Sequence, residues 1–123
     1  MSSKDDVVKF LHLYKNCVKE HFIFINRKKN MDDIARFGLS MSEVKNILLS
    51  LTPSDYVVGP ETDYNNSLGE VWTFGVYIEC CCLYVKLKIE PMKPPSGDVV
   101  MVAKCLSFHE AQYRMVFPFR NTV

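Results

Sequence analysis

Three segments rich in β-branched and aromatic residues follow one another in the second half of the chain, at residues 70–78, 82–89 and 99–108. A short polar stretch with cysteines separates the first two, and a stretch rich in proline and glycine separates the last two. Segments of this composition, divided by turn residues, are typical of strands joined by hairpins. The pattern therefore predicts a three-stranded antiparallel meander.

Apolar and polar residues alternate along the middle segment, and side chains two residues apart share one face of a strand. The apolar set is expected to line a core and comprises Leu83, Val85, Leu87 and Ile89. The polar set is expected on the opposite face and comprises Tyr84, Lys86 and Lys88. One face of the predicted sheet thus packs, and the other carries a phenol and two cations.

The first half of the chain begins with the periodicity of a helix. Apolar residues recur at three- and four-residue steps over residues 7–21, which predicts an amphipathic helix capped by Asp5 or Asp6. The apolar run 22–25 is too short for a helix. It predicts a short strand that joins the sheet.

Two short helices are expected next. Asn30 is predicted to cap a helix over residues 31–37, and Ser40 or Ser42 to open another over residues 41–51. The region before the sheet is therefore expected to be a helix, a short strand and two short helices.

Three shorter stretches complete the prediction. Residues 52–55 are expected to form a single helical turn with proline at its first position. Residues 59–69 are rich in turn formers, which predicts a long loop. The apolar residues 115–117 precede a proline and are expected to dock on the body, with an edge strand as the form that a nearby proline allows.

Composition favours one compact domain, which we expect to span residues 1–123, because 48% of the chain is hydrophobic. No stretch approaches the roughly 20 apolar residues of a membrane span. Asp5 and Asp6 lie where a secretory signal needs positive charge, so we expect a cytoplasmic protein without a membrane partner. A net charge of +1 argues against a broad surface for nucleic acid, although it leaves room for a local basic patch.

The chain has five cysteines, three of them consecutive at Cys80, Cys81 and Cys82. Neighbouring residues of a strand point to opposite faces, and no CxxC pair occurs, so we expect no metal site. Reduced thiols of a cytosolic protein are one interpretation of this cluster. A hairpin tip that senses oxidants is the alternative.

The order of several motifs resembles the MqsR family of bacterial type II toxins. The motifs are FGLSMSEVKNILLSLTPSDY, EVW, LYVKLKI and CLSFH, within residues 37–109. The resemblance implies a RelE-like α+β fold, in which helices pack on one face of a twisted antiparallel sheet made of the meander and the N-terminal strand. It also implies cleavage of messenger RNA without a metal or other cofactor, restrained by a cognate antitoxin protein.

The resemblance carries over two of the family's functional residues. The tyrosine of its Tyr-x-Lys strand matches Tyr84, and the basic residue after Ser-Phe matches His109. The family has a lysine where this chain has Val58, and a glutamine where it has Gly69. These two departures favour the alternative of a binding module that kept the fold without the chemistry.

Metal-independent RNA cleavage needs a base for the 2′-hydroxyl, an acid for the leaving oxygen and positive charge for the phosphorane. An imidazole, with an unperturbed pKa of about 6.5, can serve as base or acid near neutrality. The predicted catalytic residues are His109, Tyr84 and Lys86. The predicted RNA-binding residues are Lys88, Lys104 and Arg114.

Each of these residues also has a purely structural interpretation. Tyrosine and lysine alternate on many strands with one solvated face, and a histidine near a strand end is often only a surface residue. Trp72 and Phe74 share one face of the first meander strand and are expected in the core. Stacking of Trp72 on a nucleobase is the alternative.

Overall fold

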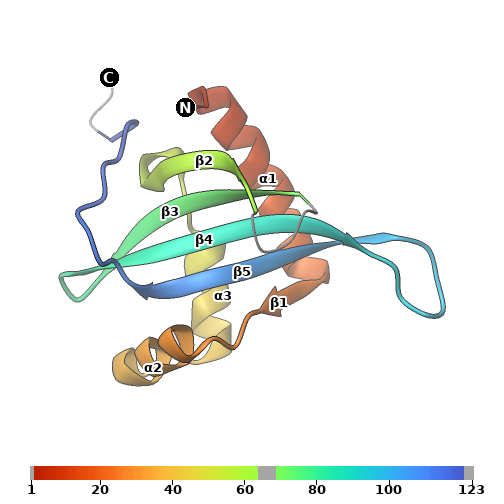
Figure 1. Cartoon of the computed structure of the whole chain (residues 1–123), viewed down its shortest axis with the longest axis horizontal. Coiled ribbons are helices and arrows are strands. Elements are labelled where there is room, and N and C mark those ends of the chain that lie inside the picture. The colour runs from red at the N-terminus through yellow and green to blue at the C-terminus, as the bar shows by residue number, and fades with distance from the viewer. Residues whose placement is uncertain (1, 64–68, 121–123) are drawn as a thin grey trace.

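The computed structural model describes residues 2–63 and 69–120, and in them the chain has an α+β fold (Figure 1). Three helices and a short 3-10 turn precede or interleave with the five strands of one sheet. The elements in chain order are α1 (Lys4–Glu20), β1 (Phe22–Phe24), α2 (Lys28–Phe37), α3 (Met41–Leu49), η1 (Pro53–Asp55), β2 (Tyr56–Thr62), β3 (Glu70–Ile78), β4 (Cys81–Met92) and β5 (Val100–Glu110).

The predicted meander is confirmed, since β3, β4 and β5 are consecutive antiparallel neighbours in the strand order β1-β5-β4-β3-β2. The predicted N-terminal strand is also present, as β1. The expectation of a purely antiparallel sheet is wrong, because β1 runs parallel to β5, with Phe22 opposite Ala103. Hairpins fix the directions of β2 to β5, whereas β1 reaches the sheet through a long helical connection that permits parallel pairing.

Strand β2 corrects the predicted loop over residues 59–69, since its second half, Gly59–Thr62, lies in that range. Gly59-Pro60 is an unusual pair for a strand, but β2 is the edge strand and pairs with β3 through two register shifts. An edge strand tolerates proline because one side of its backbone needs no partner. The part of the predicted loop over residues 64–68 lies outside the described residues.

The core lies between the sheet and the helices α1 and α3, which cover one face of the sheet behind it in the view of Figure 1. Leu83, Val85 and Leu87 are fully buried there, as the alternation in the middle strand predicts. Trp72 stacks on Phe10 of α1 with ring centroids 4.4 Å apart. Trp72 is therefore a core residue on the helix-covered face, and the alternative of a base-stacking role is wrong.

Helix starts differ from the predictions in two of three places. Ser3, not Asp5 or Asp6, caps α1, and the Asp6 side chain completes a capping box with it. Ser40 caps α3 with Glu43 as predicted, although that helix ends at Leu49. The single turn over residues 53–55 is confirmed.

Asn30 is not the cap of α2, because that helix begins at Lys28 and contains Asn30 as a fully buried residue. Its side-chain amide donates to the carbonyl oxygens of Ile25 and Leu106, and its Oδ1 accepts from the Phe108 backbone N–H at 2.9 Å. Strand β1 ends at Phe24, so the next part of β5 pairs with β4 but has no strand on its other side among the described residues. Asn30 supplies hydrogen bonds that a neighbouring strand would otherwise make.

We expect Asn30→Ala to lower the free energy of unfolding by about 2–3 kcal/mol, because it leaves several buried backbone groups without partners. Urea denaturation followed by circular dichroism measures this loss. The matched control is Asn16→Ala, which removes an exposed asparagine of α1 and is expected to change stability by less than about 0.5 kcal/mol. Equal stability of the two variants would contradict the role of Asn30.

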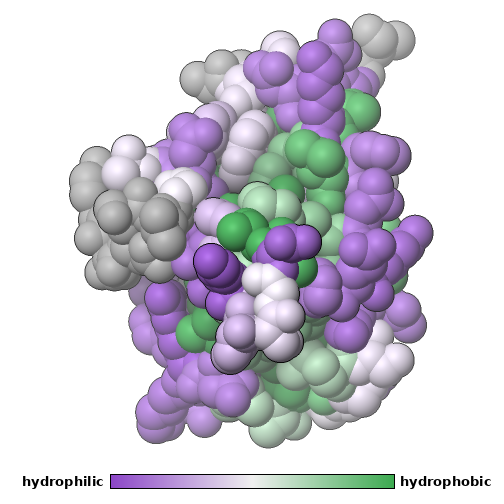
Figure 2. Space-filling model, turned by 90° about the vertical axis from the view of Figure 1, so that its right-hand side faces the viewer, coloured by the Kyte–Doolittle hydropathy of each residue, from purple (hydrophilic) through white to green (hydrophobic). Residues whose placement is uncertain are grey.

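The β4–β5 hairpin extends beyond the helices (Figure 1). Figure 2, in which this end of the molecule faces the viewer, shows apolar side chains beside a mostly hydrophilic surface. Met92, Val99 and Met101 are the exposed large apolar residues of the hairpin.

No helix in the described part of the chain is long and apolar enough to cross a membrane.

Candidate functional site

Tyr84 and His109 are directly opposite each other on β4 and β5. Their rings are stacked, with centroids 5.6 Å apart and planes 25° from parallel. Strand alternation places both on the face away from the helices, because Leu83, Val85 and their equivalents turn to the core. Two residues predicted from separate motifs are therefore brought into contact on the open face of the sheet.

Lys86 lies two residues from Tyr84 on the same face of β4 and pairs with Ser107 of β5. A register shift lies between Lys86 and Leu87. Tyr84 and Lys86 pair with His109 and Ser107 on one side of it, and the pairs on the other side, beginning with Leu87 and Cys105, are offset. Lys86 is half-buried and makes no ion pair with the described residues. Its charge is therefore available to an anion placed near Tyr84.

The His109 ring is oriented by the backbone that follows it, since Nδ1 lies 3.1 Å from the Glu110 carbonyl oxygen. A proton on Nδ1 is donated to this oxygen, which leaves Nε2 free to accept a proton. The neighbouring backbone is held as well, because the Glu110 N–H donates to Asp33 of α2 at 2.7 Å. The His109 imidazole is thus held at the end of β5 by hydrogen bonds of its own ring and of the next backbone N–H.

A second cation lies near His109. Lys29 of α2 lines a hollow of about 250 Å³ between the helix and the end of β5, together with His109, Gln112 and the acidic residues Asp32, Asp33 and Glu110. Lys28, the preceding residue, is instead paired with Asp32 at 2.7 Å. Lys29 was not among the predicted site residues, although the basic run over residues 27–29 is the signal in the sequence that points to it.

Lys88 and Lys104 differ from the other predicted site residues, because both are engaged in ion pairs. Lys88 lies on the predicted face, but its side chain is only 1% exposed and its Nζ is 2.8 Å from Asp63 and 3.5 Å from Glu90. Lys104 lies opposite Lys88 on β5, with its Nζ 2.8 Å from Glu90. Their charges are largely balanced by the two carboxylates.

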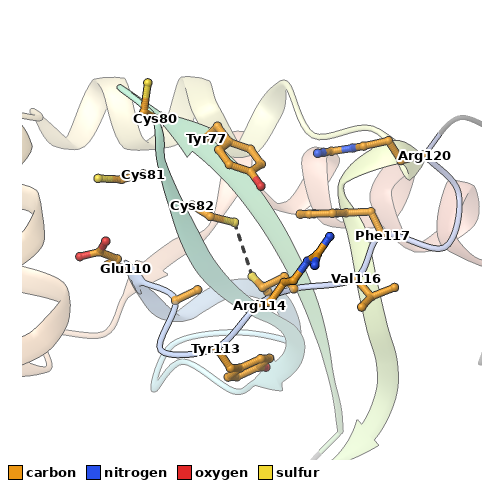
Figure 3. A pocket seen from close by; sticks show the side chains of 12 residues that line it. Tyr77, Cys80, Cys81, Cys82, Glu110, Tyr113, Arg114, Val116, Phe117 and Arg120 are labelled. Atoms are coloured by element: carbon orange, nitrogen blue, oxygen red, sulfur yellow. Dashed lines mark hydrogen bonds between the residues drawn. The ribbon is translucent and has the colours of Figure 1, made fainter.

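The segment after β5, residues 111–120, runs across the open face rather than along an edge of the sheet (Figure 3). Met115 is buried there, with its sulfur 3.8 Å from the Cys82 sulfur. Docking of residues 115–117 is thus confirmed, and the expectation of an edge strand is wrong. Arg114, a predicted RNA-binding residue, is exposed on this segment.

Tyr113 brings a further aromatic ring to the site. Its centroid is 6.1 Å from that of Tyr84, and the two planes meet at 68°, edge to face. The Tyr113 pKa is raised by partial burial, and further by Tyr84 and Glu61. Sequence reasoning missed Tyr113, because nothing in the pattern after β5 indicates that the chain returns to this face.

The three consecutive cysteines surround the tip of the β3–β4 hairpin, where Glu79 and Cys80 have positive φ values of 49° and 70°. Cys80, Cys81 and Cys82 point in different directions (Figure 3), and no group able to hold a metal occurs among the described residues. Burial raises the pKa of the Cys82 thiol, partly offset by a hydrogen bond with Tyr77 and by the charge of Arg120. A raised pKa lowers the fraction of the thiol that is ionised at neutral pH. Because the thiolate is the form that reacts with oxidants, this disfavours Cys82 as an oxidant sensor.

No protein-family model matches the chain, and no curated protein or solved structure matches it either. The resemblance to MqsR toxins stays a prediction from the sequence.

The two positions that depart from the family pattern lie near the site. Val58 of β2 is opposite Thr73 of β3, which is opposite Lys86, so the three share one row across the sheet. Gly69 lies beside Lys88, since a Cβ on it would be 3.5 Å from the lysine Cε. Both differences therefore fall along the same part of the sheet as the predicted cations.

Proposed function

We propose that this protein is the toxin of a type II toxin–antitoxin system, a RelE-like endoribonuclease that cleaves messenger RNA without a metal. The observation that carries the proposal is the stacked Tyr84–His109 pair with Lys86 on the same face, a cation without an ion pair among residues 2–63 and 69–120. These are the residue types that acid/base cleavage of RNA requires, and they come together from different strands. The MqsR resemblance supplies the independent reason to choose RNA as the substrate.

In the proposed reaction, the 2′-oxygen of a ribose attacks the adjacent phosphorus and the bond to the 5′-oxygen breaks. Nε2 of His109 accepts the 2′-hydroxyl proton, and the Tyr84 hydroxyl donates a proton to the departing 5′-oxygen. The ammonium of Lys86 stabilises the extra negative charge of the phosphorane. The products are a 2′,3′-cyclic phosphate and a 5′-hydroxyl, and neither step calls for a cofactor.

The location and the partners follow from this role. Messenger RNA places the protein in the cytoplasm, and a nuclease of this kind needs a cognate antitoxin that restrains it. Arg114 and Lys29 are candidates for contacts to the RNA backbone, because Lys29 lines the hollow that His109 also lines, and Arg114 is exposed next to Tyr113. Lys88 and Lys104 are less suited to bind the RNA backbone, since carboxylates balance their charges.

The alternative is a catalytically inactive binding module that acts through a protein partner. The paired state of Lys88 and Lys104 favours it, together with Val58 and Gly69 in place of the family's lysine and glutamine. A binding module would form a stoichiometric complex with its partner but would neither cleave RNA nor arrest growth.

Incubation of the purified protein with a long single-stranded RNA in EDTA tests the proposal. We expect cleavage at discrete sites, with cyclic-phosphate ends that a phosphatase leaves intact. The same RNA with 2′-O-methyl groups is the matched control and is expected to stay whole, because it has no nucleophile. Intact RNA in both samples, and in a separate reaction with ribosomes and Mg²⁺, would contradict the nuclease and favour the binding module.

A further inference from the structure

The segment that follows β5 is attached to the sheet before and after Tyr113. Before it, the Ala111 N–H donates to the Cys82 carbonyl oxygen at 2.9 Å and continues the pairing of β5 with β4. After it, Met115 is buried, with 7% of its surface exposed. The position of Tyr113 is therefore set by its neighbours on both sides.

Phe117 strengthens this attachment because it packs directly on the backbone of Gly75 in β3. A Cβ on Gly75 would lie 2.7 Å from Cζ of Phe117, which is closer than real side-chain contacts allow. Arg120 then covers the Phe117 ring at 3.8 Å and pairs with Asp55 at 3.4 Å. The segment thus crosses the open face on a surface shaped to receive it.

Tyr113 remains 58% exposed within this firmly held segment. In Figure 3 its ring stands clear of the other labelled side chains of the hollow. The Tyr84 ring is already stacked on His109, and Tyr113 meets it edge to face. An aromatic ring that is fixed in place, exposed and next to the acid/base pair is suited to stacking with a planar ligand.

We propose that Tyr113 is a nucleobase-stacking residue that holds one base of single-stranded RNA beside the phosphate at Tyr84 and His109. This inference rests on the proposed function, and it names a binding residue on an element that the acid/base chemistry does not use. Proteins that bind single strands combine such aromatic platforms with cations that follow the backbone. Arg114, the next residue, is exposed and provides a cation at this place.

The test uses a short single-stranded 2′-O-methyl RNA that carries one 2-aminopurine, whose fluorescence falls when the base stacks. Because this oligonucleotide cannot be cleaved by its own 2′-oxygen, binding is measured apart from catalysis. We expect the full-length protein to quench the fluorescence on binding. Tyr113→Ala is expected to raise Kd about tenfold and to lose the quench, whereas Tyr113→Phe keeps both.

Val116→Ala is the matched control, since Val116 is a large side chain that is 72% exposed on the same segment. Equal binding by Tyr113→Ala and Val116→Ala, no binding by the parent, or tighter binding by Tyr113→Ala would each overturn the inference. The last result would mean that the ring covers the site. Binding that depends on Tyr113 without RNA cleavage by the parent would refute the nuclease and leave the stacking site in place.

Discussion

Replacing His109 by alanine is expected to slow RNA cleavage by about 10²–10⁴-fold, the range over which one acid/base group contributes to an enzymatic rate. The proposed mechanism gives the 2′-hydroxyl proton to Nε2 of this ring. The Tyr84 ring would lose its stacking partner as well, so its hydroxyl would be less well placed. Single-turnover cleavage of a labelled RNA, with enzyme in excess, measures this loss without interference from product release.

His12→Ala is the matched control, because His12 is an exposed histidine of α1 on another element. We expect it to cleave RNA at the parental rate. His109→Ala should also keep the parental unfolding curve and the parental Kd for the 2′-O-methyl RNA within about threefold, since His109 lies on the open face and acts in the reaction rather than in holding the base. Parental cleavage by a folded His109→Ala protein would remove His109 from the mechanism.

Replacing Lys88 by methionine is expected to lower the free energy of unfolding by about 3–5 kcal/mol. The ammonium is buried and contacts the carboxylates of Asp63 and Glu90, whose side chains are 11% and 9% exposed. Methionine has a similar length but removes the positive charge, so the carboxylates of Asp63 and Glu90 lose the ammonium that both of them contact. Urea denaturation at neutral pH measures the change.

Lys93→Met is the control for this variant, because Lys93 is exposed in the β4–β5 hairpin and is expected to change stability by less than about 0.5 kcal/mol. A second variant, Lys88→Met with Glu90→Gln, is expected to recover part of the loss because it removes one of the unbalanced charges. If Lys88→Met is as stable as Lys93→Met but binds RNA more weakly, then Lys88 is an RNA ligand rather than a structural cation.

The elements of this protein that follow from local patterns are those that the sequence predicts. The alternation in residues 82–89 is a property of neighbouring residues, so it indicates both the strand β4 and the side chains that face the core. The cap of α3 at Ser40 is local in the same sense, because the capping box needs only Ser40 and Glu43. The site pair Tyr84 and His109 came from the resemblance and not from such patterns.

The features that the sequence did not predict all depend on contacts between distant parts of the chain. Strand β2 contains Gly59-Pro60, which indicates a loop unless one knows that it lies at the edge of the sheet. Asn30 has the signature of a helix cap, but its amide is used by Leu106 and Phe108, more than seventy residues away. Lys88 has the pattern of an exposed strand residue, but Asp63 and Glu90 enclose its charge.

The sequence by itself determined the meander and the side chains of its middle strand that face the core, because hydrophobic periodicity and turn residues act over a few neighbouring positions. Only the tertiary structure decided which cations remain available, since Lys86 is unpaired among the described residues while Lys88 and Lys104 meet carboxylates. Only the tertiary structure also shows that the segment after β5 places Tyr113 on the open face, beside Tyr84. Ion pairs and the path of a segment across a sheet depend on contacts between residues far apart in the sequence, and local patterns do not predict those contacts.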